Sequence, residues 1–286
     1  MAENQNDDGG WGDTVLSFSN ISTTLLCWGA LGFCDGGDAS AELRAEAWVR
    51  AEVGSLDPSA ITEKVKARYG RDRTFSVPIL MLCAICGRLG EPRKAWRRVM
   101  PLPFEVAAIP RRFFGAIRLP VVSYALPALI AIGQARYFHA PPGWIWPSCW
   151  LRKLAWPKAS RMLASVQPET GGFLEATPLT SFVAMALGAS GQADPPVIPG
   201  ALDFLEGSVR PDGSWPIDTN LATWGTTLAV KALAASGGVP EDAREPILAW
   251  LLGQQYRDVH PFTDAKPGGW ASFLSQHDGQ IHPGGA

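Results

Sequence analysis

The sequence predicts an all-α protein made of repeated helical hairpins, which form either a solenoid or a closed barrel. Two kinds of helical segment alternate along the chain, a glycine-aromatic turn recurs between them, and no useful stretch alternates apolar and polar residues with a period of two. With 286 residues, of which 47% are hydrophobic, the chain can bury a large core.

The first kind of segment carries almost no charge. A helix that is apolar on every face is normally buried on every face, so we expect these segments to form an inner layer. Each one opens with Ser, Thr, Asp or Asn as an N-cap and closes at glycine. The segments are residues 19–32, 76–87, 177–191 and 218–237.

The second kind of segment is amphipathic, with charges on one side and aliphatic residues or Trp on the other. This pattern is typical of helices that cover a core and face water. We therefore expect an outer layer, formed by residues 40–53, 58–69, 152–167, 198–209 and 241–255.

One spacing recurs in the turns between helices. A first residue is followed by three residues of any type, then Gly, then one residue of any type and finally an aromatic residue. This spacing is found at Gln5–Trp11, Gln167–Phe173 and Val209–Trp215, and a fourth copy keeps its Gln and its Gly-Gly-Trp but carries an inserted loop. Glycine allows a positive φ, and the aromatic residue is expected to cover the neighbouring hairpin. A period of about 40 residues indicates an array of helical hairpins. The turn residues are Gln5, Gly10, Trp11, Gln167, Gly172, Phe173, Gly213, Gln255, Gly269 and Trp270.

The net charge and the positions of the cysteines limit the partners and the cellular compartment that we expect for this protein. The net charge of −2 gives no basic field for nucleic acid, which we exclude as a partner. The polar, acidic start has no signal-peptide pattern and the five cysteines lie in apolar stretches, so we expect a reduced, cytoplasmic protein. Cys83 and Cys86 form a C-x-x-C pair without a second pair or a nearby His, which favours core packing. We expect no metal and no other cofactor.

Residues 119–133 form the longest weakly charged stretch, "LPVVSYALPALIAIG". The stretch is shorter than the roughly 20 apolar residues of a membrane-spanning helix. Arginines flank it and "WIWPSCW" follows, a mixture that also suits a membrane interface. A core helix is the favoured interpretation, and peripheral contact with the inner face of a membrane is the alternative.

The recurring turns are similar to the QW repeats of squalene–hopene cyclases and related class II triterpene cyclases. The segments "GGWGDTVLSFSNISTTLLCWGAL", "RTFSVPILMLCAICG", "GGFLEATPLTSFVAMAL", "ATWGTTLAVKAL" and "KPGGWA" follow in that family's order. The resemblance covers about residues 1 to 271 and rests on the combination of these segments.

This resemblance implies an α/α (toroid) fold of two barrels around a hydrocarbon cavity, a linear isoprenoid such as squalene as ligand, and contact with a membrane. For this chain, it implies one barrel at residues 1–147 and an incomplete, truncated second barrel at residues 148–286. In that family, a buried Asp of a D-x-D-D motif protonates a terminal alkene. Aromatic faces then stabilise the carbocations through cation–π attraction. Such an acid must be desolvated, and water must be excluded.

The chain lacks the residues that carry out the reaction in that family. No D-x-D-D occurs, and the residues after Trp270 read "ASFLSQHDGQIHPGGA". Gly225 stands where cyclases often place Asp, and their cavity Trp falls at Thr180, with Phe182 nearby. Three interpretations remain: a fragment inactive alone, one part of a split cyclase whose D-x-D-D half lies on a second chain, or a non-catalytic isoprenoid- or lipid-binding toroid.

Asp218 is the one weak candidate for a functional acid, because it lies between Trp215 and Trp224. A helix N-cap is the favoured interpretation, with Asn220 competing for that role. Asp13 and Glu175 follow their own turns in the same way, which supports a structural role. The candidate cavity residues are Trp215, Trp224, Phe182 and Thr180. His260, His277 and His282 are expected in loops, without a metal.

Overall fold

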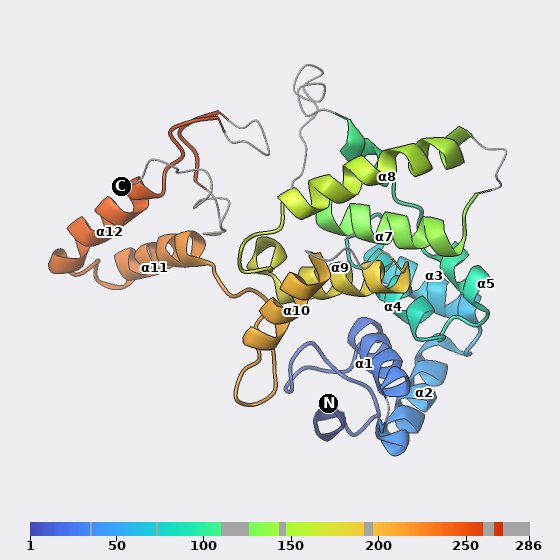
Figure 1. Cartoon of the computed structure of the whole chain (residues 1–286). Helices are drawn as coiled ribbons and strands as arrows, with labels where there is room; N and C mark the ends of the chain where they lie inside the picture. Colours follow the sequence, from blue (N-terminus) through green and yellow to red (C-terminus); the bar gives the residue numbers. More distant parts are fainter. Residues whose placement is uncertain are drawn as a thin grey trace. The chain divides into compact units, whose positions relative to one another are not determined.

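A computed structural model describes residues 1–34, 36–72, 74–109, 126–142, 147–191, 197–259 and 266–270 (Figure 1). Apart from one isolated β-bridge, all regular secondary structure in these ranges is helical. The all-α prediction is therefore confirmed. The toroid arrangement stays a prediction.

The predicted segments correspond closely to the helices of the structure. The structure adds the short α5 and residues 134–139 of α7. The α-helices are α1 (Ile21–Phe33), α2 (Ala39–Val53), α3 (Pro58–Tyr69), α4 (Ser76–Ile85), α5 (Pro92–Arg98), α7 (Leu126–His139), α8 (Pro147–Ser165), α9 (Thr177–Ala189), α10 (Val197–Gly207), α11 (Ala222–Ser236) and α12 (Glu241–Gly253). The 3₁₀ turns are η1 (Ala2–Asn4), η2 (Phe104–Ala108) and η4 (Phe173–Glu175). Of the apolar stretch 119–133, only residues 126–133 lie within the described ranges, as part of α7.

The chain divides into two compact units, each assembled from several segments. Unit 1 contains Met1–Pro103, Ala131–Leu151 and Met185–Gln192. Unit 2 contains Phe104–Ile130, Arg152–Ala184 and Ala193–Ala286. The domain boundary after residue 147 stays a prediction.

The core of unit 1 is formed around α1 and α4. Helix α1 packs against α2, α3 and α4, and nearly every residue of α4 is buried. Cys83 is part of this core as a free thiol, and desolvation raises its pKa to about 12. A thiol in such surroundings is unreactive at neutral pH. The core-packing interpretation of the C-x-x-C pair is therefore confirmed for Cys83.

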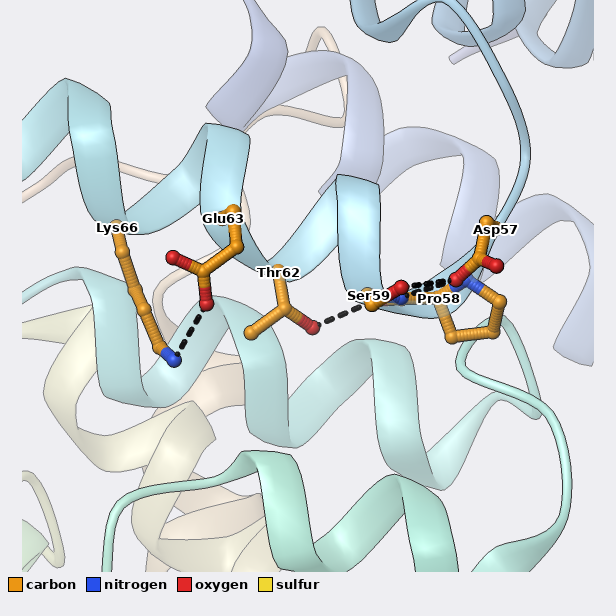
Figure 2. Close-up of polar contacts among 6 residues, drawn as sticks. All are labelled: Asp57, Pro58, Ser59, Thr62, Glu63 and Lys66. Atoms are coloured by element: carbon orange, nitrogen blue, oxygen red, sulfur yellow. Dashed lines mark hydrogen bonds and ion pairs between the residues drawn. The ribbon is translucent and has the colours of Figure 1, made fainter.

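Helix α3 illustrates how the outer helices are specified locally (Figure 2). The Asp57 carboxylate accepts a hydrogen bond from the Ser59 N–H at 2.7 Å, and Pro58 occupies the first helical position. Both features favour a helix start, because the carboxylate satisfies a free N–H and proline needs none. Ile61 and Val65, four residues apart, are fully buried. The opposite side is polar, as predicted for an outer helix.

All four glycine-aromatic turns have the same backbone hydrogen bond. In each turn, the N–H of the fifth-position glycine donates to the carbonyl of the second residue, and this glycine has a positive φ that only glycine adopts readily. The donor and acceptor pairs are Gly9 and Asn6 (2.9 Å), Gly171 and Pro168 (2.9 Å), Gly213 and Arg210 (2.9 Å), and Gly268 and Tyr256 (2.8 Å). The loop inserted in the fourth turn leaves this bond intact.

The glutamine and the tryptophan of these turns also have repeated partners. In each turn that has Gln, its amide Nε2 donates to the carbonyl of the fifth-position glycine. In each turn that has Trp, its indole Nε1 donates to the carbonyl four residues before the first turn residue. These acceptors are Met1 for Trp11 (3.1 Å), Leu205 for Trp215 (2.8 Å) and Leu251 for Trp270 (2.6 Å). The turns thus form one structural unit used four times.

The predicted burial of the inner helices is wrong for α11. Helices α1, α4 and α9 have many buried residues, whereas Thr223 is the only buried residue of α11. Trp224 is 53% exposed. The apolar composition made this helix suitable for burial, but no described segment covers it. Two predicted N-caps also differ, since α4 begins after Phe75 and α11 after Leu221, neither with a side-chain cap.

The aromatic residue of a turn is expected to stabilise the fold only where a hairpin covers it. Phe173 is fully buried, so Phe173→Ala should lower the free energy of unfolding by about 3 to 5 kcal/mol. Trp270 is 45% exposed, so Trp270→Ala should lower it by less than about 1 kcal/mol. Urea unfolding followed by far-UV circular dichroism measures both values. Equal losses in the two variants would contradict the expectation.

Candidate functional site

The segments that precede α9 and α11 lie side by side. Ala176 and Asp218 form an antiparallel bridge, and the Thr177 N–H donates to the Ile217 carbonyl at 3.0 Å. The Thr219 N–H in turn donates to the carbonyl of Glu175 at 2.8 Å. Two carboxylates that are distant in sequence, Glu175 and Asp218, therefore belong to one small structure at the start of these helices.

Glu175 has a structural role in this arrangement. Its side chain is buried, and its two oxygens accept hydrogen bonds from the hydroxyls of Thr170 (2.7 Å) and Thr219 (2.8 Å). The backbone at Leu174 and Glu175 has φ values of 55° and 56°, in the left-handed region that non-glycine residues seldom adopt. Such strain persists only where surrounding contacts hold it. The bonds to both threonines supply those contacts.

Asp218 has a different environment. It is half-buried, burial raises the pKa of its carboxyl, and no hydrogen bond or ion pair joins it to another described residue. It does not cap α11, because that helix begins at Ala222 and the Asn220 Oδ1 accepts the Ala222 N–H at 3.1 Å. The N-cap interpretation of Asp218 is therefore wrong, and the bridge to Ala176 explains why: it holds Asp218 too far from the helix start.

Asp13, the corresponding carboxylate after the first turn, has the opposite electrostatic character. It accepts hydrogen bonds from the Thr23 hydroxyl at 2.7 Å and the Asn20 amide at 2.9 Å. These two bonds lower the pKa of Asp13. Asn20 also caps α1 with its Oδ1, so Asp13 supports a helix start. The similar sequence positions of Asp13 and Asp218 thus conceal different roles.

The four predicted cavity residues lie in different surroundings. Thr180 is fully buried, and its hydroxyl donates to the Ala176 carbonyl at 2.8 Å, which makes it part of the α9 core. Phe182, also on α9, is half-buried. Trp215 and Trp224 are each about half exposed. Among the described residues, no ring contact joins Phe182, Trp215 and Trp224, and a common cavity stays a prediction.

Four exposed large hydrophobic residues lie on α11 or in the segment that leads to it. We define the α11 surface as Trp215, Ile217, Trp224 and Leu228, all of which are exposed large hydrophobic residues. Trp224 and Leu228 are four residues apart and therefore lie on the same side of α11. Ile217 and Leu228 were not among the sequence candidates. The spacing of Leu228 from Trp224, on a helix with one charged residue, was the signal that could have identified it.

The described residues give no indication of a metal site or of a membrane-spanning helix. They contain no group of three or more His, Cys, Asp or Glu side chains that could hold a metal ion. Burial raises the pKa of the Cys27 and Cys86 thiols to about 11, which disfavours the thiolate that a metal binds. Within the same ranges, no helix combines the length and the apolarity needed to cross a bilayer. His260, His277 and His282 lie outside these ranges.

Neither a protein-family model nor a curated protein matches this chain. The resemblance to triterpene cyclases therefore rests on the turns and the order of the segments alone.

The geometry allows binding of apolar ligands more readily than acid catalysis. Protonation of an alkene needs a carboxylic acid that is desolvated and shielded from water. The raised pKa of Asp218 favours its protonated form, yet the side chain is only partly buried and remains in contact with solvent. The exposed Trp224 and Leu228 of α11 provide an aromatic and aliphatic contact surface for a hydrocarbon.

Ionisation of the Asp218 carboxyl should lower the free energy of unfolding as the pH rises. Its folded-state pKa is raised above the ordinary 3.8, so the unfolded chain loses this proton first, and the free energy of unfolding falls as the pH passes upward from 3.8 through the folded pKa. Asp218→Asn should remove that fall. The variant should then be more stable than the wild type at neutral pH, and this difference should disappear at acidic pH below 3.8. Urea unfolding at a series of pH values measures the difference.

Asp13→Asn is the control variant, for which we expect a change in stability of the opposite sign. A lowered folded-state pKa contributes stability at pH values above the ordinary 3.8, and this contribution is lost as the pH falls through the folded pKa. Asp13→Asn should therefore be less stable than the wild type at neutral pH. A neutral-pH loss in Asp218→Asn as well would contradict the environment described for Asp218.

Proposed function

We propose that the chain is a triterpene-cyclase-like helical-hairpin scaffold that binds a linear isoprenoid on the α11 surface and does not cyclise it unaided. The observation that carries this proposal is the exposure of Trp224 and Leu228 on a helix whose only charged residue is Lys231. Large apolar residues that lie together on a surface are typical of ligand or partner binding. A linear isoprenoid is a branched, uncharged hydrocarbon that packs well against aliphatic and aromatic side chains.

The lack of unaided catalysis follows from the missing acid. The sequence has no D-x-D-D, Gly225 leaves α11 without a carboxylate beside Trp224, and Asp218 is in contact with water. A water-exposed carboxyl group cannot keep a strongly acidic proton directed at an alkene, and nearby water would quench a carbocation. Binding without turnover is the function that agrees with these residues.

A membrane is the natural source of such a ligand, because linear isoprenoids partition into bilayers. We include peripheral contact with the inner face of a membrane in the proposal. Trp215 supports it, since the residue is 51% exposed while its indole N–H donates to the Leu205 carbonyl. Tryptophan with an apolar face and a satisfied N–H is suited to the membrane interface.

Binding should strengthen with the length of the hydrocarbon and should depend on the α11 surface. Each buried methylene contributes about 0.8 kcal/mol, so squalene should bind more tightly than farnesol. The double variant Trp224→Ala/Leu228→Ala should weaken squalene binding by about tenfold, which corresponds to about 1.4 kcal/mol. Equilibrium binding of radiolabelled ligand presented in detergent micelles measures both effects.

Leu43→Ala is the matched control, because Leu43 is an exposed leucine of α2 outside the α11 surface. It should bind squalene as the wild type does. Failure of the wild-type protein to bind squalene, or equal binding by the double variant, would contradict the proposal. A cyclised product from squalene with the protein alone, detected by gas chromatography and mass spectrometry, would refute the non-catalytic part.

A further inference from the structure

The charges of this chain are separated along the sequence. Residues 1–43 contain no Lys, Arg or His, whereas residues 106–168 contain no Asp or Glu. The acidic residues of the first segment are Glu3, Asp7, Asp8, Asp13, Asp35, Asp38 and Glu42, and the Lys and Arg residues of the second are Arg111, Arg112, Arg118, Arg136, Arg152, Lys153, Lys158 and Arg161. One chain thus contains both an acidic and a basic segment, although its net charge is only −2.

The acidic segment contains an exposed apolar loop. We define the Val15 loop as residues 13–19, which lie directly before Asn20, the N-cap of α1. Val15, Leu16 and Phe18 are 69%, 95% and 96% exposed. Large apolar residues that lie together on a surface are typical of contact with another molecule.

Hydrogen bonds fix the shape of the Val15 loop. The Ser17 N–H donates to the Thr14 carbonyl at 3.0 Å, and the hydroxyls of Thr14 and Ser17 share a hydrogen bond of 2.9 Å. The Asn6 amide donates to the Ser17 carbonyl at 3.1 Å and to the Ser19 hydroxyl at 2.9 Å. A loop that is ordered before it binds loses little conformational entropy on binding. The loop therefore presents its apolar side chains in a prepared arrangement.

Acidic side chains lie beside these apolar residues. Asp13 is part of the loop, and the Ser19 hydroxyl donates to the Asp8 carboxylate at 2.6 Å. Asp7 lies between Asn6 and Asp8, both of which are bonded to the loop. Asp7, Asp8 and Asp13 are all exposed. The apolar loop is thus accompanied by negative charge alone.

Helix α8 combines apolar and basic side chains on its exposed side. Its buried residues recur every three or four positions and mark the inner side of the helix. They include Arg152, which is paired with Glu105 at 3.1 Å. On the opposite side, Leu154 is 78% exposed. We define the α8 surface as the exposed residues Trp150, Leu151, Leu154, Lys158 and Arg161.

We propose that the Val15 loop of one copy of the chain binds the α8 surface of a second copy. In this contact, the apolar side chains of the loop pack against Trp150, Leu151 and Leu154, and its acidic neighbours lie toward Lys158 and Arg161. Charge complementarity selects this occupant, because α8 has no acidic residue and residues 1–43 have no basic one.

The same charges determine which surfaces meet. Two Val15 loops repel each other, as do two α8 surfaces, because like charges face each other in both pairings. The contact therefore joins two different surfaces, which is a heterologous association. The proposal does not depend on isoprenoid binding, since neither surface includes a residue of the α11 surface.

Sedimentation velocity of the full chain at a series of protein concentrations tests the proposal. We expect the sedimentation coefficient of the wild type to rise with concentration. Leu16→Ala/Phe18→Ala in the loop and Leu151→Ala/Leu154→Ala in α8 should each weaken the association by about tenfold or more, because each removes apolar area that the contact buries. All four residues are exposed, so far-UV circular dichroism should show unchanged folding.

A mixture of these two variants tests the heterologous geometry. The loop variant retains the α8 surface, and the α8 variant retains the Val15 loop. The equimolar mixture should therefore associate at concentrations at which each variant alone is monomeric. A mixture that stays monomeric would contradict the pairing of these two surfaces.

The electrostatic part of the contact has its own measurement. NaCl should weaken the association of the wild type, because salt screens the attraction between exposed charges. Lys158→Glu/Arg161→Glu should weaken it by about tenfold at low salt, since like charges then face each other. Added NaCl should no longer weaken what remains in this variant.

Two control variants should associate as the wild type does. Leu43→Ala changes an exposed leucine of the same acidic segment outside the Val15 loop. Trp224→Ala/Leu228→Ala changes the α11 surface, so it separates this contact from isoprenoid binding.

Three results overturn the proposal. The first is a wild-type chain that remains monomeric, and the second is self-association that persists in the loop variant or in the α8 variant. The third is a monomeric chain that floats with phosphatidylglycerol vesicles and loses this binding in Lys158→Glu/Arg161→Glu. That result would assign the α8 surface to an anionic lipid surface.

Discussion

The fold of this protein depends on one side-chain amide used repeatedly. The glutamine at the start of a turn donates both to the glycine of its own turn and to the first turn of a later helix, as Gln5 does to Gly9 and Ala41. One residue therefore fixes the local shape of the turn and its attachment to the outer layer. The glycine four residues later is required because the helix backbone comes too close for any side chain.

This dual role explains why the same motif has different consequences along the chain. The Gln5 turn (Gln5–Trp11) and the Gln167 turn (Gln167–Phe173) are covered by helices and their aromatic residues are buried. The Val209 turn (Val209–Trp215) lacks the amide, and the Gln255 turn, which ends at Trp270, has the amide without a described helix to receive it. The exposure of α11 and Trp270 within unit 2 agrees with this difference. The aromatic residues of the first two turns are thus buried, whereas Trp215 and Trp270 of the other two are exposed among the described residues.

Much of the fold could be predicted from the sequence, and so could Asp218, Trp215 and Trp224 as candidate residues. The environment of Asp218 and the exposure of the two tryptophans could not. Caps such as Asp57 and prolines such as Pro58 act within a single helical turn, so α3 begins where its residues require. The role of Asp218 depends on the bridge to Ala176, a contact between residues 42 apart in sequence that no local pattern encodes. For the same reason Asp13 and Asp218 looked equivalent in sequence, although their pKa values shift in opposite directions.

The sequence by itself determined the all-helical class, the alternation of uncharged and amphipathic helices and the repeated turns. These properties follow from side-chain composition and from spacing over a few residues. Only the tertiary structure decided which apolar helices are buried. Composition made α9 and α11 equally suited to an inner layer, but burial requires a neighbour, and the described segments provide one for α9 alone. The apolar residues of a helix make its burial favourable, but the helix is buried only where neighbouring segments pack against it.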